Sequence, residues 1–96
     1  MKFVIALPAG AENVEASASE IKFVAPAGKA KDAVQALRKQ FVDAGFKELD
    51  ASLDALAGAI TLKQGEYTVG ITYLDTGVLP PEVTITSFGA DLEVKK

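Results

Sequence analysis

The segment from Gly28 to Phe46 constrains the fold more than any other part of this 96-residue chain. Its apolar residues recur at intervals of three and four, so they fall on one side of a helix: Ala30, Ala33, Val34, Leu37, Phe41 and Ala44. Charged and polar residues occupy the other side, where Val42 is the one large apolar residue. Gly45 stands where a left-handed residue commonly ends a helix, with apolar Phe46 directly after it. A helix with one apolar face needs another layer of structure to cover that face.

The start of this helix lacks a good capping side chain. Pro26, Ala27 and Gly28 form a turn into it, and either Ala27 or Gly28 is the expected N-cap. Neither residue caps a helix as well as Ser or Asp.

The segments around the helix show the period-two alternation of half-buried strands. We expect a hairpin over 13–16 and 20–24, in which Val14 and Ala16 share one face, and then strands over 59–63, 66–74 and 83–88. Leu92 and Val94 mark a short final strand, and 3–7 is either a first strand or an extended lead-in that Pro8 stops. The segment 49–57 is open, because its leucines suit a short helix ending near Gly58 or an irregular return to the sheet.

This order of elements predicts one α+β domain over residues 1–96. The predicted architecture is a two-layer sandwich, a mainly antiparallel sheet with one main helix packed on one face (β-β-α-β-β-β).

Several turn and packing residues together resemble a small bacterial module of unknown function. The resemblance is carried by Leu7-Pro8-Ala9-Gly10-Ala11 before a hairpin, Ala25-Pro26 before the helix, Ala44-Gly45-Phe46 after it, Gly58, and Lys63-Gln64-Gly65 before a Thr-rich strand pair. In that group the module is often repeated or appended within larger proteins, and a Trp commonly stands where this chain has Phe46. The resemblance implies the same fold and brings no catalytic motif to any position here.

Composition removes whole classes of chemistry. The chain has no Cys and no His, so thiol or imidazole nucleophile pairs, disulfides and most zinc sites are excluded. A net charge of −3 argues against a nucleic-acid surface, and the Lys and Arg residues are spread along the chain. We therefore expect no cofactor, no metal and no nucleic-acid partner, and a protein as the possible partner.

No apolar run approaches the roughly 20 residues of a membrane span, so no membrane insertion is expected. The apolar run from Phe3 to Leu7 is shorter than the roughly 7–15 residues of a signal peptide, and we interpret it as part of the mature fold. If Met1 is the native start, the expected location is the cytoplasm. Otherwise the chain is expected to be a module of an exported protein.

Leu74-Asp75-Thr76-Gly77 is the sharpest catalytic motif in the chain, because aspartic proteases carry a hydrophobic-Asp-Thr-Gly turn in the active site. Its context is wrong for that class. Val78 stands where the family has Ser or Ala, and the motif comes late in the chain. Asp, Thr and Gly are also common in turns that follow a strand, and we favour the interpretation that this motif is such a turn.

Three further patterns have ordinary interpretations. Pro26-Ala27-Gly28-Lys29 lacks the other residues of a phosphate loop, although free amides at a helix start can hold an anion weakly. The carboxylates at Asp50 and Asp54, and those near the first hairpin, are predicted to be solvated charges: Glu12, Glu15 and Glu20. Five threonines are predicted to share one sheet face, which can bind ice, sugar or a partner sheet but is more simply a solvent face: Thr61, Thr68, Thr72, Thr84 and Thr86.

The sequence alone does not reveal the function. The expected function is a non-enzymatic interaction or accessory module with no catalytic, cofactor or metal residue. The alternatives are a dimeric aspartic hydrolase using Asp75, and a binder of a small apolar ligand in a closed cavity between helix and sheet.

Overall fold

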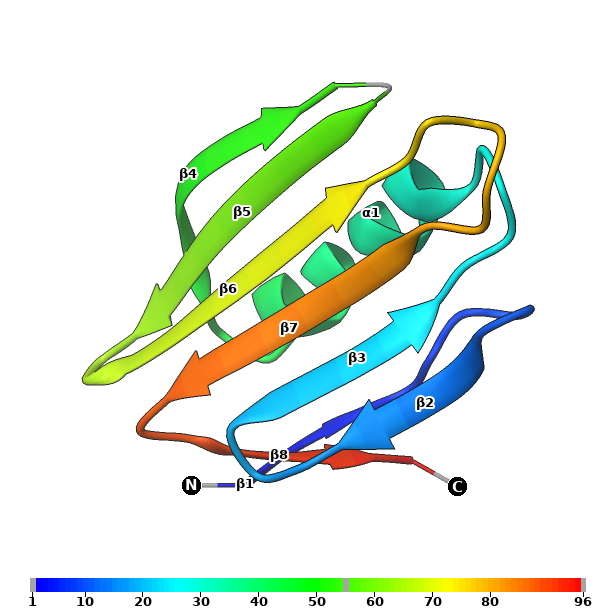
Figure 1. The fold of residues 1–96 in the computed structure, drawn as a ribbon. Helices are drawn as coiled ribbons and strands as arrows, with labels where there is room; N and C mark the ends of the chain where they lie inside the picture. The colour runs from blue at the N-terminus through cyan, green and yellow to red at the C-terminus, as the bar shows by residue number, and fades with distance from the viewer. Residues whose placement is uncertain (1, 55, 96) are drawn as a thin grey trace.

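A six-stranded antiparallel sheet carries one helix on one of its faces in the computed structural model, which describes residues 2–54 and 56–95 (Figure 1). The sheet order is β2 (Glu12–Ala16), β3 (Glu20–Val24), β7 (Glu82–Phe88), β6 (Tyr67–Leu74), β5 (Ala57–Gln64) and β4 (Lys47–Leu53). The helix is α1 (Ala30–Asp43). The predicted α+β sandwich of antiparallel sheet and helix is confirmed.

The apolar face of α1 forms the centre of the core. Ala30, Ala33, Val34, Leu37 and Phe41 are all buried, as the periodicity predicts, and Val42 is exposed. They pack against the inward residues of the central strands: Ile21, Phe23, Ile60, Leu62, Val69, Ile71, Val83 and Ile85. The prediction is wrong for one residue of this apolar face. Ala44 is the C-cap, beyond the end of the helix, and it is exposed.

The C-terminus of α1 closes as the sequence predicts. Gly45 has φ +104°, and its amide donates to the carbonyl of Val42 while the amide of Phe46 donates to that of Phe41. These two bonds are those of a Schellman motif, and the rings of Phe41 and Phe46 supply its apolar contact at 5.3 Å between centroids.

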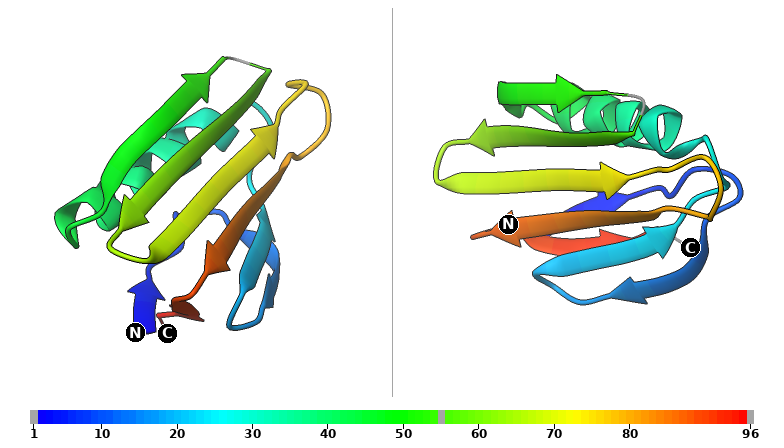
Figure 2. Two further views of the ribbon diagram at one scale, coloured as in Figure 1. Left: turned by 90° about the vertical axis from the view of Figure 1, so that its left-hand side faces the viewer. Right: turned by 45° about the horizontal axis from the view of Figure 1, so that its top comes forward.

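The two ends of the chain form a second, small sheet. β1 (Lys2–Ile5) and β8 (Asp91–Val94) pair in parallel, with Phe3 opposite Leu92 and Ile5 opposite Val94. Phe3 stacks on Phe41 with ring centroids 4.4 Å apart, so this pair lies on the helix side of the large sheet (Figure 2). Both end segments are therefore strands.

The segment after the helix is a strand and not a helix. Lys47–Leu53 is β4, an edge strand paired with β5, with an irregularity between Glu48 and Asp50. Residue 55, within the ambiguous segment, lies outside the described residues. Gly58 ends no helix either: it lies in β5, and a Cβ there would clash with the ring of Tyr73. The hairpin of β2 and β3 is confirmed, but the half-burial predicted for β2 is wrong, because every residue of β2 is exposed.

Candidate functional site

Asp75 is buried, and its carboxylate caps the N-terminus of α1. Its Oδ2 accepts from the amide of Ala30 at 3.1 Å, and its Oδ1 accepts from the amide of Gly28 at 3.1 Å. Oδ1 also accepts from the amide of Gly77 at 2.9 Å, which closes the turn after β6. Lys29 is the N-cap by position, so the prediction of Ala27 or Gly28 is wrong by one or two residues, and the side chain of Lys29 makes no capping bond. Asp75, 45 residues further along the chain than Ala30, supplies a capping bond in its place.

The surroundings of Asp75 set its ionisation. Burial by itself raises the pKa of this carboxyl group, but the amides of Ala30, Gly77 and Gly28 stabilise the charged form and hold the pKa below its ordinary value. Burial likewise raises the pKa of the neighbouring Tyr73, and the charges of Asp54 and Asp75 add to that rise. The Tyr73 hydroxyl donates to the carbonyl of Asp54.

This geometry favours the turn interpretation of the Asp-Thr-Gly motif over catalysis. A general base needs an oxygen directed at substrate, and both oxygens of Asp75 already accept backbone amides. The same bonds correct the idea of a weak anion site at Gly28 and Lys29, because an internal carboxylate already occupies that helix end.

The predicted solvated carboxylates are exposed or half-buried. Asp50 lies in β4 and Asp54 just after it, and both are exposed. Among residues 2–54 and 56–95, no group of three acidic side chains is placed to hold a metal ion.

An apolar hollow of about 390 Å³ lies beside the start of α1 and opens to solvent. The loop before β2, the end of β3 and the first turns of α1 line it: Pro8, Ala9, Ala11, Phe23, Ala25, Pro26, Lys29, Asp32 and Ala33. It differs from the closed cavity expected for an apolar-ligand binder, because it sits at the margin of the helix and not between the helix and the centre of the sheet.

The face of the sheet opposite α1 is uncovered, and we call it the open face (Figure 1). The strand register places all five predicted threonines on it, so that prediction is confirmed. The open-face positions of the three central strands alternate with the buried ones: Ala57, Ala59, Thr61 and Lys63 on β5, Thr68, Gly70, Thr72 and Leu74 on β6, and Glu82, Thr84, Thr86 and Phe88 on β7.

The charged residues of the open face lie on the flanking strands β2, β3 and β4 and at the ends of β5 and β7. In the middle of the three central strands every side chain is small or a threonine, and the two large apolar residues, Leu74 and Phe88, are each 64% exposed. Lys63 lies directly opposite Lys47 of β4, and we call these two residues the basic corner. Asp50 is next to it, opposite Thr61.

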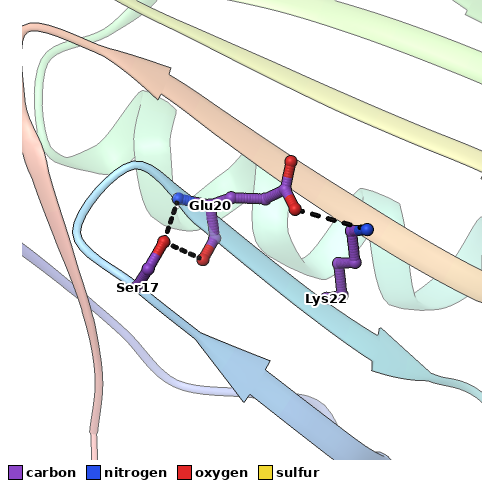
Figure 3. A network of polar contacts seen from close by, with 3 residues as sticks. All are labelled: Ser17, Glu20 and Lys22. Atoms are coloured by element: carbon purple, nitrogen blue, oxygen red, sulfur yellow. Dashed lines mark hydrogen bonds and ion pairs between the residues drawn. The ribbon is translucent and has the colours of Figure 1, made fainter.

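The diagonally opposite part of the open face is acidic, and we define the acidic corner as Glu12, Glu15, Glu20 and Glu82 around Lys22. Lys22 pairs with Glu20 at 3.4 Å, while Ser17 hydrogen-bonds the backbone of Glu20 and fixes the start of β3 (Figure 3). The hydrogen bond and charge of Glu20, followed by the charges of Glu82 and Glu15, raise the pKa of Lys22. One lysine surrounded by four glutamates leaves this corner with net negative charge.

The capping role of Asp75 and the two charged corners were not predicted from the sequence. The sequence did contain a signal for this cap. The helix start has no capping side chain of its own, and Asp75 lies in a turn with a carboxylate that could cap it. The corners had no local signal, because their residues come from five strands that only the sheet register brings together.

No protein-family model, no curated protein and no solved structure matches the chain. Within the part of the chain that the structure describes, no helix is long and apolar enough to cross a membrane.

Proposed function

We propose that this protein is a non-enzymatic interaction module that binds a protein surface through the open face. The observation that carries the proposal is the distribution of charge on β5, β6 and β7. The middle of the face has only small residues and threonines and no charge, while charged residues lie on the flanking strands and at the strand ends. A patch whose centre is depleted of charge and whose rim is charged is typical of a protein interface.

The shape of the face supports the same function. Gly70, Ala59 and the threonines leave no long side chain standing above the central strands, so another flat surface can approach closely. Beside them, a hollow of about 570 Å³ runs along Leu74, Leu79, Pro80 and Glu82 at the end of β6 and the start of β7. It gives an apolar side chain of a partner a place to bind.

Site-specific photo-crosslinking tests the proposal in cells that produce the chain. A photoreactive residue at Thr72, on the open face, is expected to give a discrete protein adduct that Thr84→Lys abolishes. The matched control is Gln35, on the exposed side of α1, where no adduct is expected. Adducts of equal yield from Gln35, or no adduct from Thr72, would overturn the proposal.

A second candidate, binding of a small apolar ligand, is supported by the apolar hollow beside α1. An environment-sensitive apolar dye is expected to fluoresce with the native protein and to lose that signal in Ala9→Phe, which places a ring in the hollow. Unchanged dye binding in Ala9→Phe would exclude this site.

The third candidate, an aspartic hydrolase, predicts acid peptidase activity that is lost in Asp75→Asn. The capping bonds of Asp75 favour a structural role instead.

A further inference from the structure

We infer that the surface bound by the open face is the open face of a second copy of this chain, in a symmetric dimer held by its two charged corners. This inference rests on the proposed function and names its partner. Three features of the open face favour a second copy of the chain over a different protein as the partner.

The first feature is charge complementarity of the face with itself. The basic corner, Lys47 and Lys63, lies at one end of β4 and β5. The acidic corner lies at the other side of the sheet, on β2, β3 and the start of β7. Its Glu12 and Glu82 are at the other end of the strands, whereas Glu20 lies level with Thr86 and Thr61. A two-fold axis lying in the interface and passing between the corners brings each basic corner over the acidic corner of the other copy. Both contacts form at once, as a symmetric dimer requires.

The second feature is the centre of the face. Between the corners, Thr61, Thr72 and Thr84 have short side chains that each include a methyl group, and Gly70 has no side chain. Two such surfaces can pack at the roughly 10 Å spacing of stacked sheets without burying an unpaired charge. The diagonal axis sets the strands of the two copies nearly perpendicular, which is one of the two arrangements that packed sheets adopt.

The third feature is area. Six strands spaced at about 4.8 Å, each of five to eight residues at about 3.4 Å per residue, make a flat face of roughly 650 Å². A stable interface buries about 800 Å² of accessible surface on each partner, and accessible surface exceeds flat area because side chains add relief. The open face is therefore large enough for a dimer of standard size.

A charge-swap experiment tests the dimer. The first variant, Lys47→Glu with Lys63→Glu, makes the basic corner acidic, and the second, Glu12→Lys with Glu82→Lys, makes the acidic corner more basic. All four side chains are exposed, so the fold should tolerate the changes. Each variant alone then places like charges over each other at both contacts. A mixture of the two variants restores opposite charges at both contacts.

Sedimentation equilibrium at low salt, over a wide range of concentration, gives the readout. The unaltered chain is expected to dimerise, with an affinity that falls in high salt because the corners are exposed. Each variant alone should dimerise at least about tenfold more weakly, and the mixture should recover the dimer. Lys29→Glu with Lys39→Glu, on and just before α1, changes net charge as much as the first variant does and should leave the dimer intact.

Two outcomes overturn the inference: a chain that stays monomeric at every concentration, or a mixture that associates no better than either variant alone. The crosslinking experiment then separates the two proposals. A monomeric chain whose Thr72 adduct contains a different protein removes the second copy as partner and leaves the interaction module standing. A monomeric chain with no Thr72 adduct removes both.

Discussion

Asp75 lies 45 residues beyond Ala30 in the chain, yet its carboxylate accepts the amide of Ala30 directly. A helix start has amides without partners inside the helix, and burying them without acceptors is costly. The chain offers no capping side chain at Lys29, so the turn after β6 provides the acceptor. One side chain thus joins the β6–β7 connection to α1, which makes the Asp-Thr-Gly turn a structural element of the core.

Replacing Asp75 by Asn should lower stability at neutral pH and leave little difference in acid. The three amides hold the folded pKa of Asp75 below its value in the unfolded chain. The stabilisation is therefore complete above the unfolded pKa and is lost as pH falls through the folded pKa. Urea unfolding of both proteins at several pH values measures this difference. Asp50→Asn, at an exposed position, is the control, and a gap between Asp75→Asn and the parent that persists unchanged in acid would contradict the assignment.

Replacing Gly45 by Ala should destabilise the protein by about 1–2 kcal/mol, because φ +104° is strained for any residue with a Cβ. The new Cβ would also meet the Gln64 amide nitrogen at 2.7 Å. Repeating the substitution in a Gln64→Ala background removes that contact and leaves the backbone strain. Ala is otherwise the better helix former, so a Gly45→Ala variant that melts higher than the parent would show that the turn is misplaced.

The elements that the sequence predicts well are those with a strong local period. Leu37 and Phe41 recur on one side of α1, and Val69 and Ile71 alternate along β6, so burial follows from spacing alone. β4 carries no such signal. Leu49 is 61% exposed, and the irregularity between Glu48 and Asp50 breaks the alternation that marks a strand. An exposed edge strand can be identified only from its pairing with β5.

Truncating Leu37 to Ala should cost about 2–5 kcal/mol, since its side chain is fully buried at the centre of the α1 stripe. Phe41→Ala should fall in the same range, with the added loss of its stacking on Phe3. Val42→Ala, at a residue 45% exposed on the other side of the same helix, is the matched control and should change stability little. Urea melts measure all three. Losses below about 0.5 kcal/mol for both Leu37 and Phe41 would mean that the wrong face of the helix is in the core.

At the scale of the whole molecule, the first and last strands of the chain pair with each other and cover part of the core. β1 and β8 are separated by almost the entire sequence, so no local sequence pattern predicts that they pair in parallel. The same is true of the open face, whose charged corners come from strands distributed along the chain. The sequence predicts the layers because layers follow from amphipathic faces. It does not predict these long-range arrangements, because they depend on strand order and register.

Ending the chain after Ala90 tests how much the pairing of β1 with β8 contributes. The truncation removes Leu92 and Val94, which cover Phe3 and Ile5, and the bond from the Lys95 amide to the carbonyl of Ile5. Burying each such side chain contributes about 1.5–3 kcal/mol, so we expect a loss of roughly 3–5 kcal/mol. That is a large part of the roughly 5–15 kcal/mol that stabilises a small domain. Urea unfolding measures the loss, with Val4→Ala, on the exposed side of β1, as a control that should be near neutral. A truncated chain with the full chain's midpoint would show that β8 is not needed to cover the core. The predicted loss instead means that β8 is needed to hold β1 in place. Because Phe3 of β1 stacks on Phe41 of α1, β8 then also stabilises the position of the helix.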